Sequence, residues 1–303
     1  MFFLFKKKRI GAAFLKEATD VHCHILPGVD DGMQDLSESL ELLAVEATAG
    51  VKRIYLTPHS MGAEGAAVDS HTHRHRSHNG EADGAATSSA STSSADSSMQ
   101  SSVTVVENNA AEYEEAEKQS AYNSEPKGGY SNAHLKERFE LFKKFYSGDI
   151  ELRLAAEYMM NREFLEKVKA NDLLTYSDGA HILVETSYIA PPVEMDEILY
   201  TLALNGYKPI IAHPERYKYM SKTDYKHLKE KGYEFQLNYL SLTGYYGPDV
   251  QERAIDLLDK GMYNFTGSDF HRVSTYYHRL PKLRLSGKRA DRLMQLFKNN
   301  DTI

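Results

Sequence analysis

Clusters of histidine and acidic residues recur along this chain, and a short apolar run precedes most of them. The clusters read Asp20-Val21-His22-Cys23-His24, Thr57-Pro58-His59, Glu157, Glu185, Ala212-His213-Pro214-Glu215-Arg216 and Gly267-Ser268-Asp269-Phe270-His271. The runs read Ile54-Tyr55-Leu56, Leu152-Arg153-Leu154-Ala155, Ile182-Leu183-Val184, Pro209-Ile210-Ile211 and Asn264-Phe265. Short apolar runs of this kind indicate strands. We therefore expect the candidate ligands to lie at the C-terminal ends of strands.

Residues two apart in a strand point to the same side, so His22 and His24 present two imidazoles to one face, as Asp269 and His271 present a carboxylate and an imidazole. A single His-x-His is a weak signal, because strand histidines are more often a hydrogen-bonded surface or core pair. The repetition favours metal ligands, since strand ends of a parallel α/β barrel converge on one mouth.

The clusters are regularly spaced in the middle of the chain, where Glu157, Glu185 and His213 follow one another at intervals of 28 residues. One interval suits one βα unit. About seven strands alternate with helical patterns, which predicts an α/β fold, a distorted (β/α)7 TIM-like barrel rather than an open sheet. At 303 residues, 41% of them hydrophobic, the chain can form this barrel as a single domain, 1–303.

Helices are predicted at 35–50, 135–145, 195–206 and 248–261, with Asp35 as an N-cap and glycines ending three of them. The segment 61–129 is different, because it is rich in Ser, Ala, Gly, Thr and Glu and has almost no apolar period. We predict a long, largely disordered insertion after the second strand, with a short acidic helix around 112–119. Its tract His71–His78 could bind zinc or nickel loosely, although a solvated polar loop is the more common case.

The formal net charge of -7 argues against a nucleic-acid partner, for which a basic stripe is expected. The one cysteine cannot form an intramolecular disulfide, and we expect a cytoplasmic protein. At the start, Met1-Phe2-Phe3-Leu4-Phe5 precedes Lys6-Lys7-Lys8-Arg9, the reverse of a signal peptide and too short to cross a bilayer. Two interpretations stay open for it: a frayed start, or weak contact with an anionic membrane surface that would make the protein membrane-peripheral.

Imidazoles mixed with carboxylates suit manganese, iron, cobalt or zinc better than magnesium. About nine candidate ligands exceed the needs of one ion. Two or three ions about 4 Å apart can hold a bridging hydroxide and clamp two phosphoryl oxygens, which makes phosphoester hydrolysis the natural reaction. Arg216, just past His213, could hold phosphate, the alternative being a surface pair with Glu215.

A cysteine-dependent phosphatase needs His-Cys, five further residues and an arginine in a phosphate-binding loop. In this chain the position of that arginine is Val29. The sequence therefore argues against a thiolate mechanism. It predicts that Cys23 is a small core residue, pointing away from His22 and His24.

The segments 20–32, 57–59, 156–158, 212–216 and 267–271 together resemble the metal-dependent tyrosine phosphatases of the PHP superfamily, the CpsB/CapC/YwqE type. The resemblance spans roughly 20–60 and 130–285. It implies the PHP fold and three divalent ions, usually described as manganese. It also implies hydrolysis by metal-activated hydroxide of phosphotyrosine on an autophosphorylated bacterial tyrosine kinase that controls capsular or exopolysaccharide synthesis.

Carried over residue by residue, the resemblance implies one ligand set for a first ion and another for the remaining two, with Glu157 bridging. Arg216 would hold phosphate, and a second arginine is expected soon after the last histidine, where Arg272 and Arg279 stand at imperfect spacing. The insertion also departs from the family pattern. The first set is His22, His24, Glu157 and Asp269, and the second is Asp31, His59, Glu185, His213 and His271.

Two alternatives remain beside this interpretation. A small-molecule PHP phosphoesterase, such as a histidinol-phosphate phosphatase, would use the same ligands. A non-catalytic regulator would bind phosphotyrosine without hydrolysing it. The complete ligand set argues against the second alternative, because a decayed enzyme rarely keeps every ligand.

Overall fold

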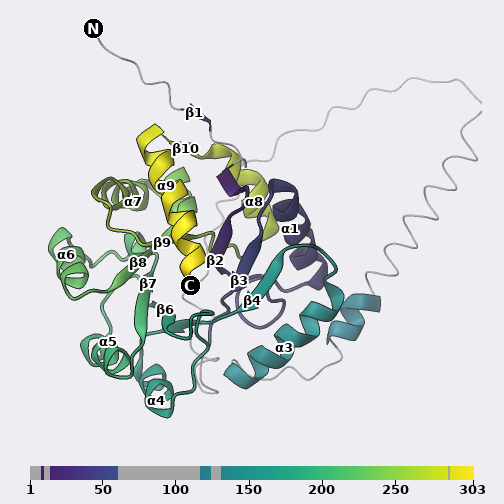
Figure 1. Cartoon of the computed structure of the whole chain (residues 1–303), viewed down its shortest axis with the longest axis horizontal. Helices are drawn as coiled ribbons and strands as arrows, with labels where there is room; N and C mark the ends of the chain where they lie inside the picture. The colour runs from purple at the N-terminus through teal and green to yellow at the C-terminus, as the bar shows by residue number, and fades with distance from the viewer. Residues whose placement is uncertain (1–7, 10–13, 61–116, 124–130, 286) are drawn as a thin grey trace, which may run out of the picture.

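The computed structural model describes residues 8–9, 14–60, 117–123, 131–285 and 287–303, which form two parallel sheets with helices outside them (Figure 1). One sheet has three strands in the order β2-β3-β4, and the other has five in the order β5-β6-β7-β8-β9. The strands are β2 (Thr19–Cys23), β3 (Arg53–Leu56), β4 (Glu151–Leu154), β5 (Glu157–Met159), β6 (His181–Glu185), β7 (Lys208–Ala212), β8 (Glu234–Asn238) and β9 (Phe265–Gly267). A short antiparallel pair, β1 (Lys8–Arg9) with β10 (Arg284–Leu285), lies apart from them.

The predicted strands and the α/β class are confirmed, but a closed barrel is not. The two sheets are separate hydrogen-bonded ladders, and single parallel bridges, Cys23 with Phe270 and His59 with Glu157, lie between them. The chain passes from one sheet to the other at 155–156, between β4 and β5. Glu157 therefore begins a strand, whereas the sequence pattern predicts that it follows one.

Helices α4, α5, α6 and α7 lie outside the five-stranded sheet, and α1, α3 and α8 lie on the side of the three-stranded sheet (Figure 1). The predicted glycine stops are confirmed for α1 and α7, which end at Gly50 and Gly261 in the left-handed conformation. Asp35 precedes α1 but forms no capping hydrogen bond through its side chain. The helices are α1 (Leu36–Ala49), α3 (Asn132–Phe145), α4 (Arg162–Ala170), α5 (Met195–Leu204), α6 (Lys222–Glu230), α7 (Pro248–Lys260), α8 (Val273–Arg279) and α9 (Gly287–Asn299).

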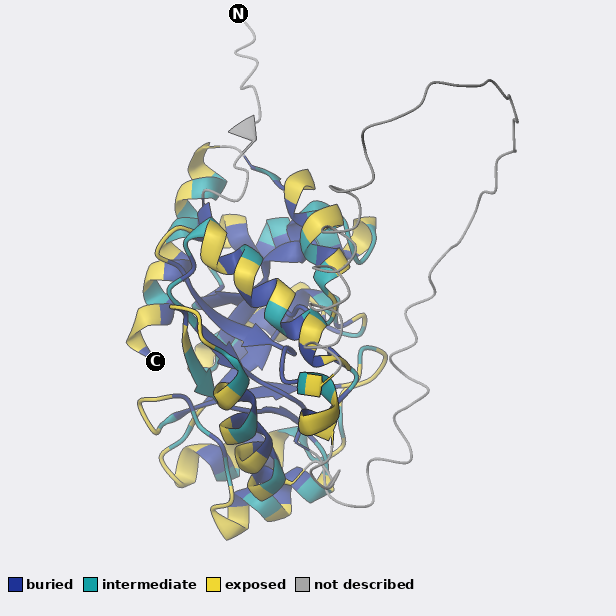
Figure 2. Cartoon of the chain, turned by 90° about the vertical axis from the view of Figure 1, so that its right-hand side faces the viewer, coloured by how far each residue is buried: buried dark blue, intermediate teal, exposed yellow. Residues whose placement is uncertain are grey.

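Most strand residues are buried, whereas the exposed residues lie mainly on the helices and loops (Figure 2). The larger core cluster packs helices on strands. A smaller cluster takes inward side chains from most strands and from the C-terminal residue. Its members are Val21, Tyr55, Ala155, Tyr176, Leu183, Ile210, Ala212, Phe265 and Ile303. Because this inner core lies among the strands, it fixes the directions in which their C-terminal ends point.

Part of the predicted insertion is ordered and packed. Residues 117–123 are helical, and Tyr122 is fully buried. Its hydroxyl donates to the carbonyl of Pro27 over 3.0 Å, and the Arg138 guanidinium lies 3.7 Å from the centre of its ring. From the same turn, Gln119 accepts the first amide of α1, that of Leu36, at 2.6 Å. This contact takes the place of the predicted Asp35 cap.

The other predictions for this segment and for the start of the chain stay predictions. Residues 61–116 and 124–130 lie outside the described residues, so neither the disorder of the insertion nor the tract 71–78 is tested. Residues 1–7 lie outside them too, and so does the proposed membrane contact. Among the described residues, no helix is both long and apolar enough to cross a membrane.

We predict that Tyr122→Ala lowers the free energy of unfolding by about 3 kcal/mol, because it opens a cavity in the core and leaves the Pro27 carbonyl without its donor. Urea unfolding measures this value. Tyr200→Ala is the control, because that side chain is 63% exposed on α5. Equal stability of the two variants would contradict the packing role of residues 117–123.

Candidate metal centre

The nine predicted ligands come together where the two sheets meet. His22 and Glu185 lie in β2 and β6, and Glu157 begins β5. The other six follow strands or lie in the loops after them, namely His24, Asp31, His59, His213, Asp269 and His271. Nearly all of these side chains are buried. Segments from across the chain thus supply one compact group of imidazoles and carboxylates.

Three overlapping groups have ligand atoms within 4.8 Å of one another. His24 and His59 each belong to two groups, and so does Glu157. The groups are His24, Asp31, His59 and His271; His22, His24 and Glu157; and His59, Glu157 and Glu185. The resemblance assigns His24 to the same ion as His22 and Glu157. In the structure His24 also belongs to a group with Asp31, which the resemblance assigns to another ion.

The two remaining predicted ligands adjoin these groups. His213 Nε2 lies 3.2 Å from Glu157 Oε1, and Asp269 Oδ1 lies 3.4 Å from His22 Nε2. The Asp31 side chain is 34% exposed and that of His271 is 23% exposed, whereas His22 and Glu157 are almost fully buried. The centre therefore opens to solvent beside Asp31 and His271.

The two oxygens of the Asp269 carboxylate have different neighbours. Its Oδ1 faces histidines, and its Oδ2 accepts hydrogen bonds from Arg216 at 2.6 Å and from Asn238 at 2.9 Å. Tyr246 also donates to Oδ2 at 3.3 Å. These donors fix the carboxylate so that Oδ1 points into the centre, which is the arrangement that outer partners give to a metal ligand.

Asp30 and Gln236 orient the ligand histidines, and sequence reasoning assigned them no role. Asp30 Oδ2 accepts from His24 Nδ1 at 2.7 Å and from the amide of His59 at 3.1 Å. Gln236 Oε1 lies 3.0 Å from His22 Nδ1 and accepts the amide of His213 at 3.2 Å. Two features of the sequence could have indicated these roles. Asp30 is an acid next to Asp31, and Gln236 is a polar residue inside the apolar strand 235–237.

Two ligands have left-handed backbone conformations, which non-glycine residues rarely adopt. His213 has a φ of 33° and Asp269 a φ of 54°. Such conformations cost of order 1–3 kcal/mol each and persist where the surrounding structure enforces them. Here the chain turns abruptly after β7 and β9, and each turn directs a ligand into the centre.

The electrostatics of the centre require positive charge. Burial and the neighbouring Glu157 raise the pKa of Glu185 to about 8. Burial alone would lower the pKa of His59, but Glu185 and Asp31 raise it to about 10. Burial likewise opposes protonation of His22, yet Glu157 and Asp269 raise its pKa. Without cations, protons on His22, His24 and His59 balance the buried carboxylates, whereas burial and Arg216 lower the pKa of His213 to about 4.

The residues present fit divalent cations. Among the described residues, both carboxylate oxygens of Glu185 are buried without a hydrogen bond, and the imidazole of His59 lies 3.4 Å from one of them. Such oxygens are costly to bury unless they are paired or bind a metal. The mixture of imidazoles and carboxylates is the donor set of manganese, iron, cobalt or zinc. Glu157, which takes part in two of the groups, is placed as a bridging ligand would be.

The three predicted arginines have different positions. Arg216 lies at the centre and contacts Asp269. Arg272 is exposed, and its Nη1 donates to the carbonyls of Asp31 and Gly32 at the open side. Arg279, at the end of α8, lies over the ring of Tyr245 at 4.9 Å.

Cys23 is fully buried, and its Sγ donates to the carbonyl of Tyr55 at 3.3 Å. Burial, with smaller contributions from Asp20 and Glu46, raises the pKa of its thiol well above the usual range. A buried thiol with a raised pKa is not a nucleophile. The prediction that Cys23 is a core residue is confirmed.

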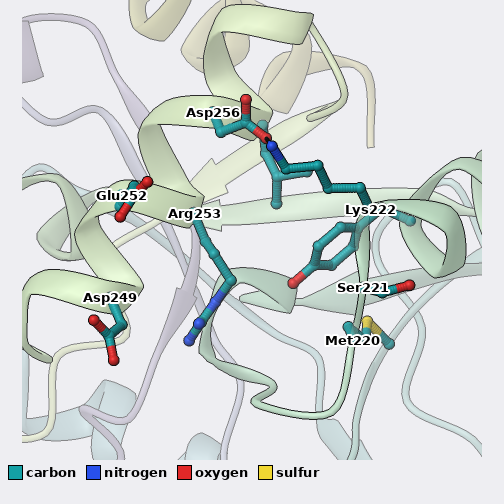
Figure 3. A pocket seen from close by; sticks show the side chains of 9 residues that line it. Met220, Ser221, Lys222, Asp249, Glu252, Arg253 and Asp256 are labelled. Carbon is teal, nitrogen blue, oxygen red and sulfur yellow. Dashed lines mark ion pairs between the residues drawn. The ribbon is translucent and has the colours of Figure 1, made fainter.

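A separate pocket of about 390 Å³ lies between α6 and α7 (Figure 3), and none of the nine ligands lines it. In Figure 3 the Arg253 side chain extends from α7 across this space. Its Nε donates to the carbonyl of Glu215 at 2.8 Å, and Tyr225 donates to the carbonyl of Pro214 at 3.1 Å. The walls of the pocket thus support, from behind, the turn that carries Arg216.

The comparisons with known proteins agree with this arrangement. The family model described as capsular polysaccharide synthesis, CpsB/CapC, matches residues 18–110 and 97–295. The chain belongs to the CpsB/CapC family. The predicted resemblance is therefore confirmed.

Two curated relatives and one solved structure extend the comparison. Tyrosine-protein phosphatase YwqE of Bacillus subtilis (strain 168) is 26% identical over 260 residues, 84% of this chain and 78% of YwqE. CapC of Staphylococcus aureus is 23% identical over 257 residues, 84% of this chain and 77% of CapC. A chain from the crystal structures of YwqE and of Streptococcus pneumoniae CpsB, described as metal-dependent tyrosine phosphatases, matches with a TM-score of 0.60 at 22% identity. This match covers 90% of this chain and 84% of the other, and it shows that the fold is shared.

We predict that Asp30→Asn weakens the binding of Mn²⁺ by about 10–100-fold, because it removes the charge that orients His24 and loosens the loop at His59. Calorimetric titration of the metal-free protein measures this change. Asp35→Asn is the matched control, since Asp35 is an exposed acid of the same segment. If both variants bind Mn²⁺ like the wild type, Asp30 has no role in orienting ligands.

Proposed function

We propose that this protein is a metal-dependent protein-tyrosine phosphatase. The observation that carries the proposal is the set of three overlapping ligand groups, with the Arg216 guanidinium 2.6 Å from an oxygen of Asp269 beside them. The relative YwqE, a tyrosine-protein phosphatase, supports the same conclusion. The proposed ligands are the nine predicted residues, with Arg216 for phosphate and Arg272 as the second phosphate arginine, because Arg272 stands at the open side.

Divalent ions, when bound, supply an activated water and neutralise charge on the phosphoryl group. We propose three such ions, with manganese as the principal one. The side chains of the protein position the phosphate group. Arg216 is held between two tyrosine rings, with its guanidinium carbon 4.4 Å from the Tyr188 ring centre and 4.3 Å from that of Tyr246. A guanidinium fixed in one plane can donate two parallel hydrogen bonds to phosphate oxygens.

The proposed leaving group needs little help from the protein. A tyrosine phenolate has a conjugate acid with a pKa near 10, so its departure needs less proton donation than that of an alkyl alcohol. We assign no dedicated general acid to the centre, and we therefore propose aryl phosphates as the substrate class rather than alkyl phosphates such as histidinol phosphate. The three ligand groups support hydrolysis over mere binding.

The protein substrate we propose is an autophosphorylated bacterial tyrosine kinase that regulates capsular or exopolysaccharide synthesis. The family description, capsular polysaccharide synthesis, supports this link. We further propose a cytoplasmic protein with one catalytic domain spanning 1–303. The single bridges at both gaps between the sheets support a distorted barrel for that domain.

We predict that chelation abolishes hydrolysis of a phosphotyrosine peptide and that Mn²⁺ restores it, while Cys23→Ser keeps most of the activity. The reason is that the carboxylate and imidazole groups bind the ions, whereas the Cys23 thiol is buried and protonated. Phosphate release before and after chelation is the measurement. A folded, metal-loaded Cys23→Ser enzyme without activity would point to a thiolate mechanism instead.

We predict that Arg216→Ala lowers kcat/KM by the equivalent of about 2–4 kcal/mol, by analogy with the loss of one charge-stabilising donor. The substitution leaves Asp269 with two donors, Asn238 and Tyr246, so metal content should stay near that of the wild type. Steady-state kinetics and metal analysis are run on the same preparation. An unchanged kcat/KM would remove Arg216 from the proposed mechanism.

A further inference from the structure

A row of arginines and tyrosines leads from the metal centre to the end of α8. Arg216 lies between Tyr188 and Tyr246, and the ring of Tyr246 lies 4.6 Å from that of Tyr245. The Arg279 guanidinium lies 4.9 Å from the Tyr245 ring centre. The inner end of the row is anchored at Asp269, and its outer end is an arginine at the C-terminus of α8.

Arg279 has a single side-chain contact among the described residues, with the ring of Tyr245. Among the described residues its guanidinium forms no hydrogen bond and no ion pair, and its ring contact with Tyr245 is what holds it. The acids of α1 that reach α8 have other partners: Glu38 accepts the amide of Val273, and Glu41 accepts the hydroxyl of Tyr277. A cation on a ring face keeps its outward donors available.

The surroundings of Arg279 are basic, although the whole chain is acidic. Residues 270–290 contain six lysines and arginines and no aspartate or glutamate, while the formal net charge of the chain is -7. The segment begins next to His271, at the side where the centre opens. Positive charge near an opening attracts negatively charged substrates. Two other basic residues of the segment are already engaged, Arg284 with the carbonyl of Pro281 and Arg289 with Asp259.

We propose that Arg279 is a specificity-determining residue that binds an acidic side chain of the substrate near the phosphotyrosine. The proposal rests on the proposed phosphatase activity and names its substrate class, phosphotyrosine segments with a neighbouring acid. The distances suit an extended peptide. The three steps along the row are each shorter than 5 Å, so the guanidinium groups of Arg216 and Arg279 lie at most about 14 Å apart. Three or four extended residues span about 10–14 Å, so an acid at that separation from the phosphotyrosine comes within reach of Arg279.

The test compares paired phosphotyrosine peptides that differ only in one glutamate or glutamine, with this residue moved along both flanks of the phosphotyrosine. The metal-loaded wild type should prefer the glutamate peptide, at one or more positions, by about two- to five-fold in kcat/KM at low salt. High salt should remove the preference. Arg279→Gln should abolish it, and Arg279→Lys should keep part of it. Arg289→Gln is the control with the same change in charge, and it should keep the full preference.

Two results would overturn the proposal. One is a wild-type enzyme with no preference at any position. The other is an Arg279→Gln enzyme that slows on both peptides equally and keeps their ratio, because that result would place Arg279 on the phosphate itself. If the wild type hydrolyses neither peptide, the proposed phosphatase activity fails. Fluorescence anisotropy with the same labelled peptides then still measures whether the glutamate preference exists and depends on Arg279.

Discussion

The burial of several carboxylates where the two sheets meet is the constraint on which the site depends. Glu157, Glu185 and Asp269 are almost fully buried, and a buried carboxylate is costly unless opposite charge lies beside it. Burial and Glu157 raise the pKa of Glu185 to about 8, whereas, despite burial, neighbouring histidines lower the pKa values of Glu157 and Asp269. Protons can balance the charge in part, but divalent cations would do so with more charge in less space. The buried carboxylates and imidazoles therefore form a group whose charge divalent cations would balance.

The gaps between the sheets lie where the ligands are. One single bridge joins His59 to Glu157, and the other joins Cys23 to Phe270, next to His24 and His271. Regular ladder pairing would hold the strand ends at a fixed spacing, whereas a single bridge lets the chain turn and direct side chains inward. The left-handed conformations of His213 and Asp269 likewise turn the chain after β7 and β9 and direct these side chains inward. Bound ions would add links across both gaps, so metal binding and stability of the fold are expected to be coupled.

The sequence identified the candidate ligands that the structure brings together because strand ends and the β period are local signals. His22 and His24 follow directly from the alternation of a strand, and the equal spacing of Glu157, Glu185 and His213 follows from repeated βα units. Contacts between distant segments leave no such signal. Gln236 was visible only as a polar residue in an apolar strand. The burial of Tyr122 against Pro27 depends on a partner 95 residues away, so composition alone assigned its segment to a disordered insertion.

Closure of the barrel was the least predictable feature, since the number of strands does not determine whether each neighbour pairs along its full length. A break at 155–156 divides one predicted strand into β4 and β5 and turns Glu157 from the end of a strand into the beginning of one. The same break places its carboxylate between His22, His59 and His213. The departure from a regular barrel and the place of Glu157 in two of the ligand groups are thus one structural event. A regular strand through Ala155 and Ala156 would carry Glu157 further along the first sheet, and the two sheets would then share no common carboxylate.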